Sequence, residues 1–131
     1  MTNKRKIAIV GSRDFAKLEL VDALIYKLNK DEHEIVSGGA VGVDTQAQNT
    51  AILNGFEVQI FYPDWSQGKG AGIARNSDIV AYADDVYAFY DGKSRGTLDS
   101  MRKAVAAGKL RRVFNEHEEA KDIIPSPDPV V

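Results

Sequence analysis

Two kinds of hydrophobic pattern alternate along the chain. Short apolar runs rich in β-branched and aromatic residues predict five strands, over residues 6–10, 33–36, 57–62, 85–90 and 110–114. Apolar residues at three- and four-residue steps predict helices with one buried face, over residues 15–29, 43–51, 73–82 and 98–105. A strand is thus followed by a helix four times before the last strand.

This alternation predicts the fold class. Helices that connect strands of one sheet bury their apolar faces by crossing over a parallel sheet, with right-handed connections. We therefore expect one α/β domain, a Rossmann-like three-layer α/β/α sandwich with a mostly parallel five-stranded sheet. The 131 residues suffice for one core, which we assign to residues 1–115. Residues 116–131 are acidic and then proline-rich, which predicts a C-terminal tail that is mobile or packs on a partner subunit.

Composition excludes several classes of protein. The chain has no cysteine, and its two histidines, His33 and His117, are far apart in sequence, so we expect no disulfide and no metal site. No apolar run approaches the roughly 20 residues that cross a bilayer, so we expect a cytoplasmic protein without a membrane partner. With 17 Lys and Arg against 19 Asp and Glu, the net charge is -2. This balance argues against a nucleic-acid partner and predicts that any anion site is local.

The positions of the glycines suggest where a ligand binds. Nine of the eleven glycines lie in the segments that follow the first four strands: Gly11, Gly38, Gly39, Gly42, Gly68, Gly70, Gly72, Gly92 and Gly96. In a parallel sheet these segments meet at the carboxyl edge, where open α/β sheets bind ligands. Tight turns alone would explain some of these glycines but not the five cations among them.

The segment Ser37 to Asp44 connects a strand to a helix and is one candidate phosphate site. Its residues Ser37, Gly38, Gly39 and Gly42 can expose backbone N–H groups at the positive end of a helix. The spacing differs from the dinucleotide and P-loop patterns. Asp44 either caps its own helix or accepts hydrogen bonds from ribose hydroxyls.

The segment after the fourth strand is the strongest phosphate candidate. It combines two cations, two hydroxyls and two glycines at a helix start: Asp91, Gly92, Lys93, Ser94, Arg95, Gly96 and Thr97. Arg95 suits bidentate binding of an oxyanion, with Lys93 as a looser charge and Asp91 as a partner for ribose. A solvated turn is the alternative.

Two further segments complete the predicted carboxyl edge. The glycine-rich stretch 62–76 has the length of a lid; Trp65 either stacks on a base or fixes this loop to the domain. Arg75 and Asn76 are expected beside Arg95, where an anion would separate the two guanidinium groups. The short first loop contributes Gly11, Ser12 and Arg13, and Arg13 contacts either the ligand or Asp14.

These motifs resemble a known family. Gly-Ser-Arg-Asp-Phe, Ser-Gly-Gly-Ala-x-Gly-x-Asp, Tyr-Pro-Asp-Trp, Gly-Ala-Gly-x-x-Arg-Asn and Asp-Gly-Lys-Ser-Arg-Gly-Thr follow in this order within about residues 6–109. They are similar to the YspA, YpsA-related branch of the SLOG superfamily, which also contains the Lonely Guy phosphoribohydrolases and DNA-processing protein A. The resemblance implies a Rossmann-like fold that binds nucleotides or nucleotide-derived signals.

The resemblance also bears on catalysis. Gly96 and Thr97 match the Gly-Thr of the Lonely Guy phosphate motif, and Arg75 resembles their catalytic arginine. Ser100 stands where those enzymes have a glutamate, and a hydroxyl cannot replace a carboxylate in glycosidic hydrolysis. The remaining catalytic candidates are Arg75, Asp99 and Asp44.

We therefore expect the chain to bind a phosphorylated nucleoside or nucleotide-derived ligand, with or without Mg²⁺, in a sensing or sequestering role. One alternative is a nucleotide N-glycosidase with a different carboxylate. Another is a single-stranded nucleic-acid binder resembling DNA-processing protein A. The resemblance further implies a homodimer.

Overall fold

The strands of the computed structural model, which describes residues 3–130, form one parallel sheet. They are β1 (Arg5–Gly11), β2 (His33–Ser37), β3 (Glu57–Ile60), β4 (Asp85–Phe89) and β5 (Leu110–Phe114). Their order is β3-β2-β1-β4-β5, and every neighbouring pair is parallel. The predicted Rossmann-like α/β fold is thus confirmed.

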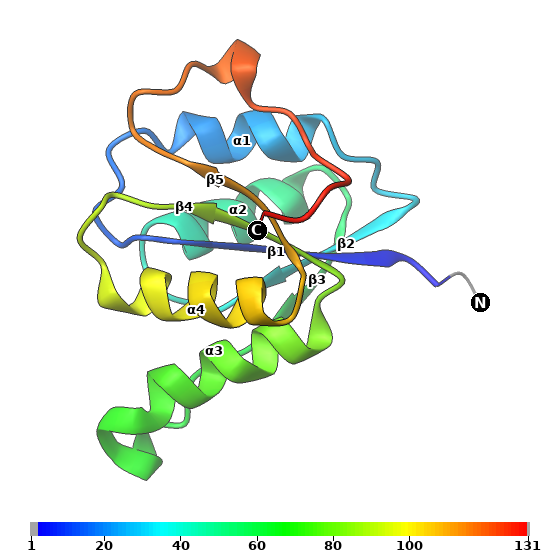
Figure 1. Ribbon diagram of the computed structural model, residues 1–131. Helices are drawn as coiled ribbons and strands as arrows, with labels where there is room; N and C mark the ends of the chain where they lie inside the picture. Colours follow the sequence, from blue (N-terminus) through cyan, green and yellow to red (C-terminus); the bar gives the residue numbers. More distant parts are fainter. Residues whose placement is uncertain (1–2, 131) are drawn as a thin grey trace.

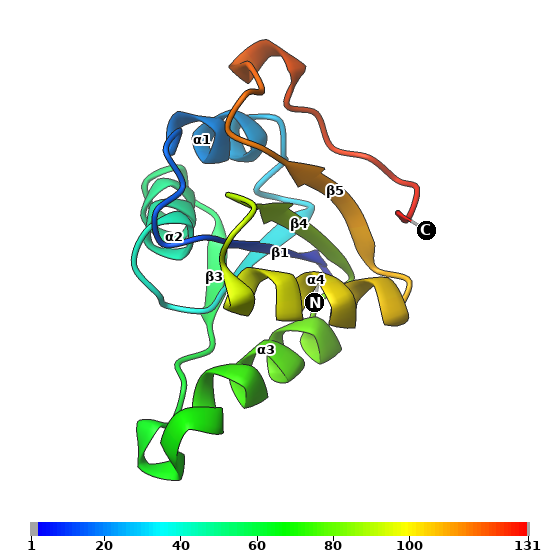
Figure 2. The same ribbon diagram turned by 60° about the vertical axis from the view of Figure 1, so that its left-hand side comes forward.

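Four helices cover the two faces of the sheet (Figure 1). They are α1 (Glu19–Tyr26), α2 (Val43–Leu53), α3 (Ala71–Tyr82) and α4 (Arg95–Ala106). Alternate residues of the buried strands face opposite layers. Ile7, Ile9 and Ile35 pack against α1 and α2, whereas Ala8 and Val10 pack against α3 and α4. Figure 2 shows the resulting three layers.

The helix limits differ from the predicted limits at two places. Helix α1 is shorter than the apolar pattern suggested, because a turn precedes Glu19 and the chain leaves the helix after Tyr26. Helix α3 is longer and follows a 3-10 helix, η1 (Trp65–Gly70), so much of the predicted lid is helical. The Asp64 carboxylate caps η1 by accepting a hydrogen bond from the Ser66 N–H at 3.1 Å. Helix α3 and η1 project beyond the sheet in both views.

The C-terminal segment packs on its own domain, which differs from the expected mobile or partner-bound tail. It contains a second 3-10 helix, η2 (Ala120–Asp122), followed by Ile123, whose side chain is fully buried in the α1 layer. The Lys27 ammonium donates to the Ile123 carbonyl at 2.5 Å, and the Tyr87 hydroxyl bonds the backbone of Ser126. Ile123 shares its core cluster with Tyr87 and Phe89 of β4 and with Phe114 of β5. The division at residue 115 stays a prediction, with its ends at 1–2 and 131 outside the described residues.

The strand order fixes where a ligand can bind. Chain connections leave β1 and β4 toward opposite sides, so β1 and β4 flank the switch point of the sheet. Ligands of open α/β sheets bind at the carboxyl ends of such strands. No helix within residues 3–130 is long and apolar enough to cross a membrane.

Candidate functional site

A cavity of about 570 Å³ opens at the carboxyl edge of the sheet. Its walls come from the segments after β1, β2 and β3 and from the first turns of α3 and α4. The sequence-predicted residues among them are Gly11, Arg13, Gly39, Asp44, Trp65, Arg75, Asn76, Ser94, Gly96 and Thr97. Segments far apart in sequence therefore meet in one place, as the switch point requires.

Hydroxyl groups join the β1 and β4 loops beneath this cavity. Ser12 is fully buried, and its backbone N–H donates to the Phe89 carbonyl at 3.0 Å. Its hydroxyl accepts a hydrogen bond from the Asp91 N–H at 3.2 Å and lies 3.3 Å from the Thr97 hydroxyl. Ser12 therefore positions these loops and does not face the cavity.

The loop between β2 and α2 depends on glycine at two positions. Gly42 has φ of 85° and packs so closely on the backbone of Arg13 that a Cβ atom would clash with it. Gly39 has φ of 72°, and a Cβ atom there would lie 2.6 Å from the Tyr62 ring. Larger residues would push the β1 and β3 loops away, so glycine sets the shape of the cavity wall.

Asp44 is a buried carboxylate in the cavity wall. Its Oδ2 accepts a hydrogen bond from the Ala40 N–H at 3.3 Å. Burial raises the pKa of Asp44 to about 6, against the opposing effects of the Ala40 hydrogen bond and the Arg75 charge. The carboxylate thus occupies the Ala40 amide, which lies within the segment 37–44 that was predicted to hold a phosphate.

The loop before α4 is likewise closed by its own side chains. Asp91 accepts hydrogen bonds from the N–H groups of Lys93 at 2.8 Å and Ser94 at 2.9 Å. Although burial raises the pKa of Asp91, these hydrogen bonds lower it by more, and the net shift is downward. The Ser94 hydroxyl in turn caps α4 by accepting from the Thr97 N–H at 3.2 Å. Both predicted phosphate loops therefore use part of their amides internally.

Arg75 and Asn76 brace the cavity from α3. Arg75 Nη1 donates to the Gly38 carbonyl, and its Nε donates to Asn76 Oδ1 at 3.1 Å. Asn76 Nδ2 reaches the Gly96 carbonyl at 3.3 Å and Asp99 Oδ2 at 3.2 Å. These bonds link the loop after β2 to the start of α4. Arg75 lines the cavity without the predicted neighbour, because Arg95 is exposed and not part of the wall.

Aromatic and cationic side chains form the rim. Tyr62 and Trp65 are 67% and 68% exposed although both line the cavity. Arg13 and Lys69 also line it, and neither takes part in any ion pair within the described chain. The rim thus offers flat apolar surfaces and uncompensated positive charge side by side.

The other predicted ligand residues lie outside the cavity wall. Ser37 is fully buried and donates to the Asp44 carbonyl and to Gln48. The residues that support a loop or face solvent without lining the cavity are Ser12, Ser37, Gly38, Gly42, Asp91, Gly92, Lys93 and Arg95. Their role as ligand contacts stays a prediction.

Some lining residues were not among the predicted contacts. Tyr62, Lys69 and Ile73 belong to the lid segment, whose length and glycines predicted a binding loop but not which side chains face inward. Lys69 belongs to the 3-10 helix η1 and Ile73 to the following helix α3, and no hydrophobic period in the sequence predicts an element as short as η1.

Of the catalytic candidates, Asp99 is held away from the cavity. Its Oδ2 binds Lys103 Nζ at 2.8 Å as well as Asn76, whereas Ser100 lines the wall. Asp44 is the one carboxylate among the described lining residues. Residues 3–130 contain no group of three or more His, Cys, Asp or Glu side chains placed to hold a metal ion.

Comparisons with known proteins identify the class of domain. The family model of DNA recombination-mediator protein A matches residues 1–63. The Gene 61 protein of Mycobacterium phage D29 is 39% identical over 114 residues, covering 79% of this chain and 91% of that protein. The chain therefore belongs to the SLOG superfamily, in one family with the phage Gene 61 protein. Its predicted place in the YspA branch stays a prediction.

Two solved structures share the fold. DNA processing protein A from Streptococcus pneumoniae has a TM-score of 0.71 and 26% identity over 86% of this chain. The protein from Helicobacter pylori has a TM-score of 0.66 and 28% identity over 82% of this chain, and its structure concerns the single-stranded DNA binding mode of that protein. The chain spans 50% and 64% of the lengths of these two structures.

These findings correct two predictions. The expectation of a small phosphorylated nucleoside as ligand was wrong, because the matching family model and both solved structures are of DNA-processing protein A, and one of these structures concerns single-stranded DNA binding. The expectation that nucleic acid is not a partner was wrong for the same reason. Net charge was a poor guide, because affinity for a phosphate backbone depends on where the cations lie.

Proposed function

We propose that this chain binds single-stranded nucleic acid at the carboxyl edge of its sheet. One observation carries the proposal: the rim of the cavity combines exposed aromatic rings with Arg13 and Lys69, which have no ion pair within residues 3–130. The likeness to a structure concerned with single-stranded DNA binding supports it.

The aromatic residues suit unpaired bases. Tyr62 and Trp65 keep about two thirds of their surface exposed, at the rim of the cavity. Proteins that bind single strands without sequence preference stack bases on such rings, at about 1–3 kcal/mol per base. A duplex keeps its bases stacked inside, so these rings favour a single strand.

The cations suit the phosphate backbone. Arg13 extends from the loop after β1, and Lys69 from η1, so they lie on different walls of one cavity. Neither has a carboxylate partner in the described structure. A strand whose bases reach the aromatic rings would place its phosphates between these two charges, which gains energy by releasing counterions.

Fluorescence anisotropy with a labelled oligothymidylate of about 20 nucleotides tests the proposal at about 50 mM salt. We expect saturable binding that weakens steeply with salt, and weaker binding of a duplex of equal length. Absence of binding to the single strand would contradict the proposal.

A matched pair of variants locates the site. The double variant Arg13→Ala/Lys69→Ala is expected to bind at least about tenfold more weakly and to lower the salt slope by about 1.4, since each contact with a single-strand phosphate contributes about 0.7. Lys4→Ala/Lys30→Ala removes the same charge at the opposite edge and is expected to leave binding unchanged. Equal losses in both variants would show binding by net charge alone.

A further inference from the structure

The cavity is small compared with the footprint of a typical single-strand binder. Its volume of about 570 Å³ lies within the range of sites for one small molecule, about 300–1,000 Å³. Single-strand binding domains of other folds cover about 4–16 nucleotides. A strand that enters this cavity must therefore continue over another part of the surface.

Helix α4 carries basic side chains on the face opposite the cavity. Thr97, Ser100 and Ala104 are buried on its inner face. Arg95 and Arg102 are exposed and stand seven residues apart, which places them on one outer face about 10 Å apart along the axis. With exposed Lys93 just before the helix, they form a basic strip that we call the α4 strip.

The α4 strip lacks a compensating carboxylate. None of its three cations takes part in an ion pair within residues 3–130. Asp99 is the one carboxylate of α4, and it stands three residues before Arg102. Its Oδ2 is instead bound by Lys103 at 2.8 Å and by Asn76 of α3 at 3.2 Å. The charge of Asp99 is thus paired with Lys103 and not with a cation of the strip.

The start of α4 connects the cavity with the α4 strip. Gly96 lines the cavity, and a Cβ atom at Gly96 or Gly92 would meet no heavy atom within 4 Å. The backbone at the start of α4 is therefore open to a chain passing over it. A strand can cross here from the cavity to the outer face.

We propose that single-stranded nucleic acid leaves the cavity over the start of α4 and continues along Lys93, Arg95 and Arg102. This inference rests on the proposed function and extends the binding surface beyond the cavity. The cavity holds the first nucleotides by stacking and charge, and the α4 strip holds the phosphates that follow by charge alone.

A length series tests this path. Binding of oligothymidylates of about 4 and about 16 nucleotides is measured for the wild type, Arg102→Ala and the control Lys30→Ala, an exposed lysine at the far edge. We expect Arg102→Ala to weaken binding of the long strand about threefold to eightfold and to lower its salt slope by about 0.7, with the short strand unaffected. Lys30→Ala should change neither, and Arg102→Lys should restore the long-strand affinity.

The outcomes separate the two proposals. Wild-type binding of both strands with no effect of Arg102→Ala, or with equal effects on both lengths, would overturn the α4 path and leave the proposed function standing. Failure of the wild type to bind either strand would overturn both.

Discussion

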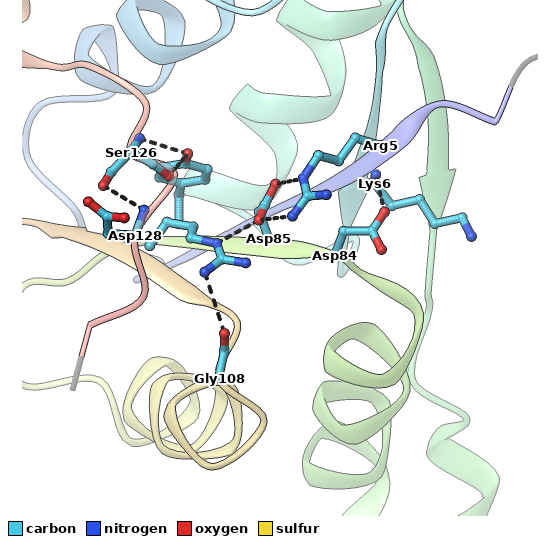
Figure 3. A network of polar contacts seen from close by, with 9 residues as sticks. Arg5, Lys6, Asp84, Asp85, Gly108, Ser126 and Asp128 are labelled. Carbon is cyan, nitrogen blue, oxygen red and sulfur yellow. Dashed lines mark hydrogen bonds and ion pairs between the residues drawn. The ribbon is translucent and has the colours of Figure 1, made fainter.

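Both edges of the sheet carry cationic side chains, but among residues 3–130 these cations form ion pairs at the amino edge and not at the carboxyl edge. At the amino edge, Asp85 lies between Arg5 and Arg111, with N–O distances of 2.6 Å to each guanidinium (Figure 3). Lys4 pairs with Glu57. At the carboxyl edge, Arg13, Lys69, Lys93 and Arg95 have no ion pair in the described chain. The cations of the amino edge hold the fold together, and those of the carboxyl edge are free to bind.

The pKa values of the buried carboxylates at the two edges are shifted in opposite directions. Burial raises the pKa of Asp85, but hydrogen bonds from Arg5 and Arg111 lower it by more, so it lies below its ordinary value. Asp44 is buried with no hydrogen bond from a guanidinium, and burial outweighs the Arg75 charge and the Ala40 hydrogen bond, so its pKa rises to about 6. A chain of net charge -2 can therefore still present cations without an ion pair, here Arg13, Lys69, Lys93 and Arg95 within residues 3–130, because other cations hold its ion-paired acids.

The largest expected effect follows from removing the amino-edge carboxylate. Asp85→Asn leaves Arg5 and Arg111 without their partner and should lower the free energy of unfolding by about 3–4 kcal/mol, at the lower end for a buried pair because Arg5 is half exposed. Urea denaturation measures this loss. Affinity for a single strand should stay within about twofold of the wild type; a loss comparable to that of Arg13→Ala would mean that the edges are not separable.

Asp44 should make the protein less stable as pH rises, the opposite of what a carboxylate with a lowered pKa does. Its pKa is raised from 3.8 to about 6, so the folded state keeps the proton longer than the unfolded state. The contribution is fully present below pH 3.8 and is lost as pH rises through about 6, which amounts to roughly 3 kcal/mol. Comparing urea denaturation of the wild type and Asp44→Asn across this range isolates the effect. Parallel curves for the two proteins would refute it.

The aromatic rim should affect binding and not folding. Trp65→Ala is expected to weaken single-strand binding by about 1–3 kcal/mol, the energy of stacking one base. Tyr26→Ala is the matched control, because Tyr26 is 66% exposed on α1 and distant from the cavity wall. Anisotropy titrations measure both variants. If Trp65 only fixes its loop, the loss should appear in thermal stability instead.

The smallest expected effect is on the stability of Arg13→Ala. An exposed cation without a partner contributes little to folding, so the free energy of unfolding should change by no more than about 0.5 kcal/mol. A larger loss of unfolding free energy, measured by urea denaturation, would show that Arg13 has an ion-pair partner in solution. It would contradict the assignment of Arg13 to ligand binding.

The fold was predictable from the sequence because it depends on period and length. Alternating strand and helix patterns predicted a parallel sheet, and the glycines after its strands predicted the binding edge. The limits of α1 and the helical part of the lid were not predictable, since they depend on tertiary contacts. The packing of Ile123 was not predictable either, because two apolar residues just before a proline-rich stretch show no periodic pattern.

The edge at which the candidate cavity opens was predictable, but the contacts around it were not. Glycines and cations pointed to phosphate at two helix starts, yet Asp44 and Asp91 take amides of both loops in the structure. Net charge then argued against nucleic acid, because composition does not show which cations are paired. That distinction requires knowing that Asp85 of β4 lies between Arg5 and Arg111, which are far from it in sequence but stand on the two neighbouring strands.

Chemical-shift mapping of backbone amides during titration with an oligothymidylate of about 16 nucleotides tests the central claim most directly. We expect shifts concentrated at the carboxyl edge, around Arg13, Trp65, Lys69 and Gly96, with the amides around Arg5, Asp85 and Arg111 unchanged. Shifts centred on the amino edge, or spread evenly over the surface, would contradict the account.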